Sequence, residues 1–457
     1  MTSNVKQGEK RRPPMVEGSF RLQEVSEPNL YRDTFAYTKL PRAFFDNRSV
    51  PMDLPEEMWI TDTTFRDGQQ ARTPYTIDQV LALYDLMHKL DADTGLIRQS
   101  EFFLYSKTDR QAVRKCQERG YKFPQVTGWI RAVKSDFRLV KQMGLKETGI
   151  LTSCSDYHLF LKLRKGRSAA LAMYLDTVKS CLDAGILPRC HFEDVTRADL
   201  YGFVLPLASE LLSLGQEYNV EIKMRMCDTM GVGQPWAQAA LPRSIPKIVH
   251  ALRHEVGVGA EQLEFHGHND LHKVVANSVS AWLYGCAVCN CSLLGIGERT
   301  GNAPLEALVV EQGQLTEKST KIDYSVITEI AEYFSRELSH EIPSNYPLVG
   351  RDFNVTRAGI HADGLLKNEE IYNIFDTNKL LNRPASVMIT DKSGVAGIKH
   401  WIEQRYEIEP LRKSDRRLTS IYDLIKLAYE QGRTTGIADE EMAGWVGEKF
   451  GQLQVKE

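Results

Sequence analysis

The sequence predicts a (β/α)8 TIM barrel with an irregular N-terminal arm and a mostly helical C-terminal region. Three observations support this fold class. Eight short apolar or β-branched runs alternate with longer segments of helical period over roughly 250 residues. No G-x-G-x-x-G motif follows the first run, which disfavours the rival doubly wound open sheet. Polar residues gather directly after several runs, where barrel enzymes carry their catalytic groups.

The N-terminal arm is expected over residues 1–57. It contains prolines among aromatic side chains, which predicts an irregular segment that packs against another part of the molecule. Residues 1–14 are polar and lack the apolar stretch of a secretory signal. No run elsewhere approaches the roughly 20 apolar residues that cross a bilayer.

The barrel is expected over residues 58–315. The predicted strands are 59–62, 95–99, 125–130, 147–152, 186–191, 221–227, 262–266 and 288–294. The predicted helical segments are 76–91, 135–144, 168–185, 199–218, 234–256 and 270–285. Thr76, Ser135 and Ser168 are predicted N-caps, and Gly144 and Gly185 lie where glycines end helices.

The remainder, residues 316–457, is predicted to form an appended helical region. Residues 322–339 have the pattern of an amphipathic helix, and a proline-rich break follows them. Further helices are expected at 418–431 and 438–450.

Composition and charge limit the function classes. The chain has 457 residues, 42% hydrophobic and 26% charged, with a formal net charge of −3. This balance gives no electrostatic case for a nucleic acid or a membrane surface as partner. The eight cysteines are scattered rather than set in a framework, which predicts reduced thiols in the cytoplasm. Cys286, Cys289 and Cys291 are interpreted as buried core, because a zinc site needs a second pair.

The sharpest motif is the His-Gly-His run at the end of the seventh predicted strand. His266 and His268 are two residues apart, so both imidazoles point to the same side of a strand. Imidazole nitrogen suits Zn, Mn, Fe or Co, and a carboxylate completes such a set. Asp67 is expected beside them after barrel closure, with Asn302 as a fourth ligand through its carbonyl oxygen. The alternatives are a pair of hydrogen-bonding histidines and a loop salt bridge between Asp67 and Arg66.

Three more polar residues are expected on the same rim, the C-terminal end of the barrel. Arg66 is a candidate to oppose negative charge on an enolate or thioester oxygen. Glu193 is a candidate to orient a base or a water, with an ion pair to Arg197 as the alternative. Thr229 offers a hydroxyl to a substrate carboxylate, with a turn role before Gly231 as the alternative.

Together these segments resemble the DRE-TIM metallolyase superfamily, which includes 2-isopropylmalate, homocitrate and citramalate synthases and 3-hydroxy-3-methylglutaryl-CoA lyase. The matching segments are Asp-x-Thr-x-Arg-Asp-Gly-x-Gln at 62–70, Glu-Asp at 193–194 with Arg197, Asp-Thr-x-Gly at 228–231, His-x-His-Asn-Asp at 266–270, and 295–302. The resemblance implies an acyltransferase or lyase with a divalent metal, Mn²⁺ or Co²⁺ first and Mg²⁺ or Zn²⁺ as alternatives. For the synthases it implies acetyl-CoA and a 2-oxo acid as substrates.

The run Ala-Gly-Ile-His-Ala-Asp-Gly-Leu-Leu-Lys at 358–367 resembles the signature of the synthase branch. The resemblance implies that His361, with a tyrosine similar to Tyr372, reaches the site of the neighbouring subunit as part of the base. It therefore implies a homodimer or a higher homo-oligomer. The lyase branch carries a catalytic cysteine after its last strand, and residues 295–302 contain none.

One departure from the synthase pattern bears on the substrate. Synthases usually carry Ile-Glu-x-Gly-Phe-Pro after the second strand, whereas residues 97–103 read Ile-Arg-Gln-Ser-Glu-Phe-Phe. The interpretation is that the family glutamate is missing and that Arg98 pairs with a second substrate carboxylate, as in oxaloacetate. Together with residues 28–33 and the long arm, this resembles the Re-citrate synthases of anaerobic bacteria. The alternative is that Arg98 points outward and that other residues determine the choice of substrate.

The sequence therefore predicts a metal-dependent Claisen condensation of acetyl-CoA with a 2-oxo acid, with oxaloacetate and citrate as the favoured pair. The runner-up activities are those of 2-isopropylmalate, homocitrate and citramalate synthases. Two different classes stay open: a non-catalytic barrel that binds a metal or metabolite, and a 2-His-1-carboxylate iron oxygenase.

Overall fold

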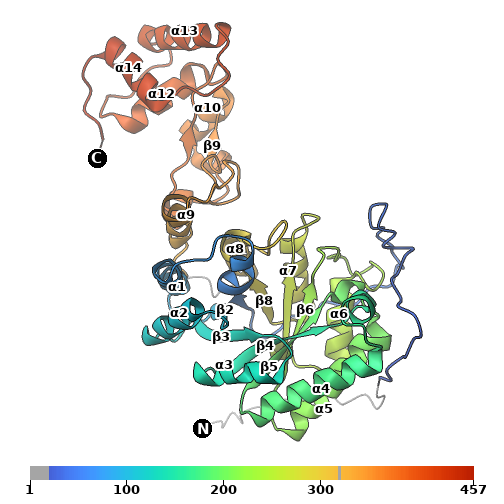
Figure 1. Ribbon diagram of the computed structural model, residues 1–457. Coiled ribbons are helices and arrows are strands. Elements are labelled where there is room, and N and C mark those ends of the chain that lie inside the picture. The colour runs from blue at the N-terminus through green and yellow to red at the C-terminus, as the bar shows by residue number, and fades with distance from the viewer. Residues whose placement is uncertain (1–19, 317–320, 457) are drawn as a thin grey trace, which may run out of the picture. The chain divides into compact units, whose positions relative to one another are not determined.

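The computed structural model describes residues 20–316 and 321–456, so the first 19 residues of the predicted arm lie outside the described part of the chain. The chain divides into two compact units, Met1–Ile322 and Asp323–Glu457. The predicted barrel is confirmed in the first unit. Its parallel strands follow one another around a closed barrel in sequence order, and β1 pairs with β8 (Figure 1).

The strands of the barrel are β1 (Trp59–Asp62), β2 (Ile97–Phe103), β3 (Gln125–Ile130), β4 (Glu147–Ser153), β5 (Leu187–Glu193), β6 (Lys223–Asp228), β7 (Leu263–Gly267) and β8 (Val288–Cys291). The outer helices are α1 (Ile77–Asp91), α2 (Lys107–Glu118), α3 (Phe137–Gln142), α4 (Arg167–Asp183), α5 (Leu205–Glu217), α6 (Ile245–His250), α7 (Val274–Leu283) and α8 (Leu305–Leu315). Helix α1 begins with a capping box in which Thr76 and Gln79 satisfy each other's backbone N–H groups.

The alternation of side chains along each strand determines which residues fill the interior of the barrel. Successive side chains of a strand point to opposite faces, so every second residue points inward. On β5 the inward residues are Arg189, His191 and Glu193. Arg189 and His191 contact β2 across the barrel, and Glu193 contacts the neighbouring β4. The interior is therefore polar near the rim, and the apolar positions of each strand pack outward against the helices.

The structure differs from the predicted elements at β2 and α2. Strand β2 continues to Phe103, four residues beyond the predicted 95–99. Helix α2 was not predicted, because its sequence is strongly polar. It buries a narrow stripe of Ala112, Val113 and Cys116. The available signal was its N-terminal capping box, in which Ser106 and Asp109 satisfy each other's backbone N–H groups.

The predicted helix over 234–256 is also shorter than expected. It begins at Ile245, after a turn-rich segment that contains Pro235 and Pro242. Proline lacks the backbone N–H that an interior helical position requires, which accounts for the late start.

The described part of the arm, residues 20–57, runs along the outside of the barrel unit. Its backbone bonds to the barrel at Gln23, whose N–H donates to the Gly202 carbonyl at 2.9 Å. Asp46 forms an ion pair with Lys247 at 2.5 Å. Phe45 packs against Trp236 with ring centroids 6.0 Å apart. The arm is thus held by several separated contacts rather than by regular secondary structure.

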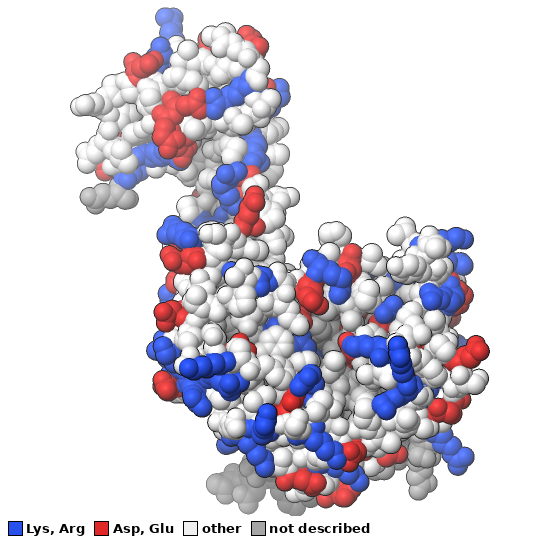
Figure 2. All heavy atoms as spheres, in the orientation of Figure 1, with Lys and Arg blue, Asp and Glu red and all other residues white. Residues whose placement is uncertain are grey.

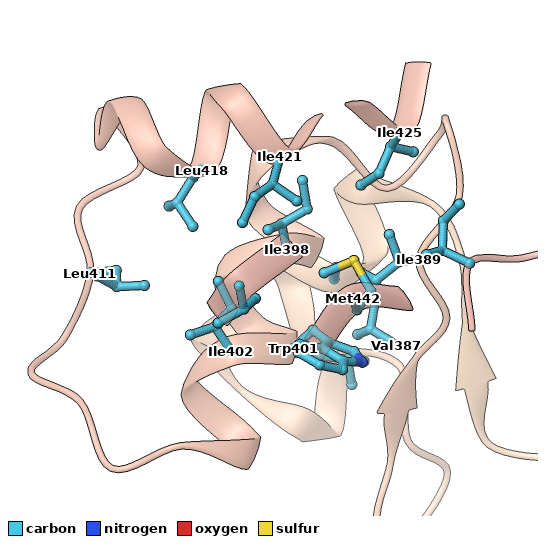
Figure 3. Packing of buried hydrophobic residues seen from close by; sticks show 14 of the residues in the cluster. Val387, Ile389, Ile398, Trp401, Ile402, Leu411, Leu418, Ile421, Ile425 and Met442 are labelled. Atoms are coloured by element: carbon cyan, nitrogen blue, oxygen red, sulfur yellow. The ribbon is translucent and has the colours of Figure 1, made fainter. Parts of the chain in front are cut away.

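The second unit has its own hydrophobic core. Its elements are α9 (Val326–Glu337), β9 (Val355–Thr356), α10 (Gly359–Lys367), α11 (Thr377–Leu381), β10 (Ser386–Val387), α12 (Gly394–Arg405), α13 (Arg416–Glu430) and α14 (Asp439–Phe450). Figure 3 shows the inner faces of α12, α13 and α14 meeting at Trp401, Ile421 and Met442. The helices predicted at 322–339, 418–431 and 438–450 correspond to α9, α13 and α14.

The surface and the thiols agree with the composition. Lys and Arg side chains lie next to Asp and Glu side chains over the visible face of the barrel unit (Figure 2). All eight cysteines are free and buried. Among the described residues, no helix combines the length and apolarity that a membrane span needs.

The core of the second unit predicts a local loss of stability on truncation. Ile421 is fully buried, so Ile421→Ala is expected to destabilise this unit by about 2–5 kcal/mol through lost burial and a cavity. Leu427 lies on the same helix at 49% exposure, and Leu427→Ala is the matched control. Urea unfolding followed by tryptophan fluorescence measures both. Equal unfolding midpoints for the two variants would contradict the packing described.

Candidate active site

A buried set of side chains of types that can ligate a metal ion lies at the C-terminal end of the barrel. Asp67, His266 and His268 each offer a ligand atom, and these atoms all lie within 4.8 Å of one another. Asp67 comes from the helical turn Thr64–Gly68 after β1, and the histidines come from the end of β7. The structure thus brings together the three residues that the sequence predicted as ligands.

Hydrogen bonds orient both imidazoles. His266 Nδ1 lies 2.7 Å from Asn290 Oδ1, and the Asn290 amide in turn donates to Thr61. His268 Nδ1 lies 2.8 Å from the Thr229 carbonyl. Because each Nδ1 faces an acceptor, it carries a hydrogen. The Nε2 of His266 keeps a lone pair for a ligand, and the Nε2 of His268 lies 3.4 Å from Asp67 Oδ2.

The charges of the ligand set also suit a cation. Burial lowers the pKa of His266 to about 3, and the charge of Arg225 acts in the same direction, so the ring is neutral. Burial by itself would raise the pKa of Asp67, but the Arg66 guanidinium and the histidines bring it below its usual range. The His266 nitrogen and the Asp67 carboxylate are therefore available without proton loss near neutral pH. Burial by itself would lower the pKa of His268, but the neighbouring Asp67 carboxylate raises it, so His268 releases a proton when a cation binds.

Asn302 adds a fourth oxygen beside this set. Its backbone pairs with that of His268, and its Nδ2 donates to the Ile296 carbonyl at 3.3 Å. Its Oδ1 is buried without a hydrogen-bond partner among the described residues. Buried carbonyl oxygens almost always have a hydrogen-bond partner or a ligand, and a bound metal ion would provide one for Asn302 Oδ1. The donor set fits a divalent ion of the Mn²⁺, Co²⁺ or Zn²⁺ type.

A cavity of about 200 Å³ opens above these ligands. It contains three of the other predicted residues, Arg66, Glu193 and Thr229. The full lining is Arg66, Asp67, Gln70, Trp129, Leu151, His191, Glu193, Arg225, Cys227, Thr229, His266, His268, Glu298 and Arg299.

Arg66 is fixed from three sides. Its Nη1 lies 2.5 Å from Asp67 Oδ1, and its Nε lies 3.7 Å from Glu101 Oε2. Its guanidinium also lies over the Trp129 ring, 4.8 Å from the centroid. The salt bridge with Asp67 and the place beside the metal ligands therefore occur together, although the sequence suggested them as alternatives.

The cavity floor is a network of buried charges. Arg225 bonds Glu101 and Glu264 at 3.0 Å each, and Arg189 bonds Glu101 at 2.6 Å and Glu147 at 3.0 Å. Opposite charges at these distances favour the charged forms, and they lower the pKa of Glu264 to about 2 despite its burial.

Glu193 has partners that differ from the predicted ion pair, whereas Thr229 lies in the predicted turn before Gly231, in which the Gly231 N–H donates to the Asp228 carbonyl at 3.1 Å. His158 Nδ1 lies 3.0 Å from Glu193 Oε2, and the Lys162 ammonium lies 3.2 Å from Oε1. Arg197 pairs with Asp194 instead, so the suggested Glu193–Arg197 ion pair is wrong. The Thr229 hydroxyl accepts a hydrogen bond from the Asp194 N–H at 2.8 Å, which leaves its own hydrogen free to donate.

The prediction that Arg98 enters the pocket is wrong. Arg98 lies near the start of β2, at the opposite end of the barrel from the metal ligands. It pairs with Glu57 at 3.1 Å and covers the Trp59 ring. Glu101, near the true end of β2, points inward to Arg66 and Arg225.

His361 and Tyr372 belong to the second unit. Their rings lie together, with centroids 4.4 Å apart. Both are exposed, and the exposed apolar residues Ile360, Ile371 and Ile374 lie close to them in sequence.

Sequence reasoning missed His191, Arg225 and His158. The first two alternate with known rim residues, His191 two before Glu193 and Arg225 two before Cys227, so the period of a strand was the available signal. Gly149 provides the space for His191, because a Cβ at that position would lie 2.6 Å from its Nε2. His158 gave no local signal, because it meets Glu193 only through the pairing of β4 with β5.

Comparisons with known proteins agree with this geometry. Residues 57–334 match the family model described as HMGL-like. A citrate (Re)-synthase of Syntrophus aciditrophicus is 54% identical over 437 residues, covering 95% of this chain and 70% of that protein. A citrate (Re)-synthase of Clostridium kluyveri is 50% identical over 426 residues, covering 93% and 94%.

This chain is also similar to more distant proteins. A 2-phosphinomethylmalate synthase of Streptomyces hygroscopicus is 38% identical, covering 94% of this chain and 98% of that protein. The solved HMG-CoA lyase of Bacillus subtilis superposes with a TM-score of 0.51 at 18% identity, covering 64% of this chain and 97% of that one. At this identity the likeness shows the fold alone.

The bond between His266 and Asn290 predicts a metal-binding phenotype. Asn290→Ala removes the acceptor that fixes the His266 tautomer and is expected to weaken Mn²⁺ binding by about 10–100-fold. Cys289→Ala, on the same strand but on its outer face, is the matched control. Isothermal titration with Mn²⁺ measures both. Unchanged affinity in Asn290→Ala would show that His266 is not oriented in this way.

Proposed function

The chain belongs to the HMGL-like family, and we propose that it catalyses the condensation of acetyl-CoA with oxaloacetate and water to give citrate and CoA. It is an acyltransferase of the citrate synthase type. The observation that carries this function is the identity of 54% and 50% to proteins named citrate (Re)-synthase, over 95% and 93% of the chain. The citramalate, 2-isopropylmalate and homocitrate synthases are only 25–28% identical.

The lining of the cavity supports a 2-oxo acid with two carboxylates. Arg66, His191 and Arg225 reach it from three different strands or turns, so its inner wall is polar and carries cations. A branched apolar side chain, as in 2-oxoisovalerate, would lie against these polar groups without offering them a hydrogen bond. With Arg98 outside the cavity, these residues and Thr229 are the proposed carboxylate partners.

Asp67, His266, His268 and Asn302 are the proposed metal ligands, with Mn²⁺ or Co²⁺ as the proposed ion. A divalent cation held there would polarise the ketone of the 2-oxo acid as a Lewis acid. Arg66 would oppose the negative charge that develops on oxygen as the enolate of acetyl-CoA forms and attacks. Its contacts with Asp67, Glu101 and Trp129 fix the guanidinium before the substrate arrives.

The proton of the acetyl methyl group needs a base. We propose His361 with Tyr372, contributed by the second unit of a neighbouring subunit, and Glu193 as the group that orients them or a water. The exposed Ile360, Ile371 and Ile374 support this arrangement, because apolar residues next to a functional pair are typical of a surface that is covered in an assembly. The proposed assembly is a homodimer.

We also propose a cytoplasmic location. The eight buried free thiols support it, since reduced cysteines are typical of that compartment.

A CoA-release assay tests the function. With Mn²⁺ or Co²⁺ under reducing conditions, we expect CoA release from acetyl-CoA with oxaloacetate and little with 2-oxoisovalerate, 2-oxoglutarate or pyruvate. Arg66→Lys is expected to lower kcat about 100-fold, because one oriented donor to the developing oxyanion is lost. Arg98→Ala is the matched control, with an unchanged KM for oxaloacetate.

Two outcomes would contradict this assignment. Turnover of 2-oxoisovalerate or 2-oxoglutarate in place of oxaloacetate would favour a runner-up synthase. Binding of Mn²⁺ and oxaloacetate by titration without any CoA release would favour a non-catalytic barrel.

Mixing two inactive variants tests the proposed assembly. His266→Ala and His361→Ala homodimers are each expected to be inactive. A heterodimer of the two variants has one site with both histidines intact if His361 acts across the subunit boundary. Co-expression of equal amounts should therefore restore about one quarter of the wild-type activity by statistical pairing. Failure of the mixture to recover activity would rule out action on the neighbouring site.

A further inference from the structure

Glu193 contacts His158, a histidine that has no part of its own in the proposed reaction. His158 lies in the helical turn Tyr157–Lys162 after β4, and its two ring nitrogens face two consecutive carboxylates. Nδ1 lies 3.0 Å from Glu193 Oε2, and Nε2 lies 3.6 Å from Asp194 Oδ2. A ring bridged in this way cannot rotate without losing both contacts, so it fixes the direction of the Glu193 carboxylate.

The other partners of Glu193 are less constraining. The Lys162 side chain is 51% exposed and is a flexible point charge. The Ser153 hydroxyl donates to the same Oε2 that faces His158. His158, with its side chain 16% exposed, is the rigid group of the set.

The arm reaches the same turn from outside. The Asn29 N–H donates to Asp156 Oδ2 at 2.7 Å, and the Tyr157 hydroxyl donates to the Leu30 carbonyl at 2.7 Å. Asp156 and Tyr157 directly precede His158 in the chain. The arm backbone therefore holds the first residues of the turn that presents His158 to Glu193.

Two cations brace the Tyr157 ring. Arg32 of the arm lies 5.6 Å from the ring centroid, and Arg197 lies 4.2 Å from it. Arg197 also pairs with Asp194, the second carboxylate that faces His158. The ring thus lies between a cation of the arm and the cation that pairs with Asp194, one end of the histidine bridge.

Arg167 connects Asp156, which precedes the turn, to the backbone of the arm. Its guanidinium is fully buried, bonds both oxygens of Asp156 at 3.0 and 2.8 Å, and donates to the Gln23 carbonyl of the arm at 2.9 Å. A buried ion pair that also binds arm backbone makes the turn and the arm one unit, because separating them would leave buried groups without partners.

We propose that His158 is a positioning residue for Glu193, and that arm residues 29–32 act on the reaction through the turn that carries His158. The proposal rests on the proposed function only in giving Glu193 a part in the reaction. It assigns the arm a role in turnover rather than only in stability.

Steady-state kinetics test the histidine. His158→Ala is expected to lower kcat about 10–100-fold, because Glu193 loses its fixed direction, while the KM values for acetyl-CoA and oxaloacetate change less than about threefold. His158→Gln keeps an N–H donor toward Glu193 and should recover part of kcat. An unchanged kcat in His158→Ala, or equal losses in both variants, would overturn the positioning role.

A double-mutant cycle tests the arm. Tyr157→Phe removes the hydroxyl bond to Leu30 and is expected to lower kcat about threefold in the wild-type background, but not further in the His158→Ala background. His254→Ala removes a different arm contact, the 3.0 Å pair with Asp53, and is the control with unchanged kcat. An equal loss from Tyr157→Phe in both backgrounds would contradict action through His158.

Hydrogen–deuterium exchange separates this inference from the proposed function, since it needs no turnover. Amides of residues 154–163 are expected to exchange faster in Tyr157→Phe and at the wild-type rate in His254→Ala. A wild-type protein without CoA release would overturn the proposed function and still leave the exchange result to judge the arm contact. Unchanged exchange in Tyr157→Phe would overturn the arm contact even in an active enzyme.

Discussion

The candidate site depends on a layer of buried ion pairs across the axis of the barrel. Glu101 from β2, Arg189 from β5, Arg225 from β6 and Glu264 from β7 are at most 3% exposed and bond one another directly. Removing one member would leave an uncompensated buried charge, at a cost of about 3–5 kcal/mol. The layer therefore fixes how four strands stand relative to one another, and three of them lead into the rim residues Glu193, Thr229 and His266.

This layer also sets the charges of the residues above it. Glu101 holds Arg66, and Arg66 in turn keeps the Asp67 carboxyl ionised. The Arg225 charge adds to burial in keeping His266 neutral. A carboxylate and a neutral imidazole a few ångströms apart are what a divalent cation needs, so a network that looks structural prepares the ligands for binding.

The sequence was sufficient for those features that follow from strand geometry. The eight alternating segments predict the barrel, and the spacing of His266 and His268 with the position of Asp67 predicts the ligand set. The error at Arg98 arose because nothing local marks where β2 ends, and four more residues move the rim from Gln99 to Phe103. The bridge from His158 to Glu193 depends on tertiary pairing, which no spacing in the chain encodes.

The polar floor of the barrel has a consequence for how such a site changes over evolutionary time. Its inward positions on β2, β4, β5, β6 and β7 share partners, so a charge change at one of them is tolerated only together with a compensating change at another. A rim residue such as Thr229, whose partner is a backbone N–H, carries no such requirement. New substrate preferences are therefore accessible in single steps from the loops, while the floor is inherited as a set.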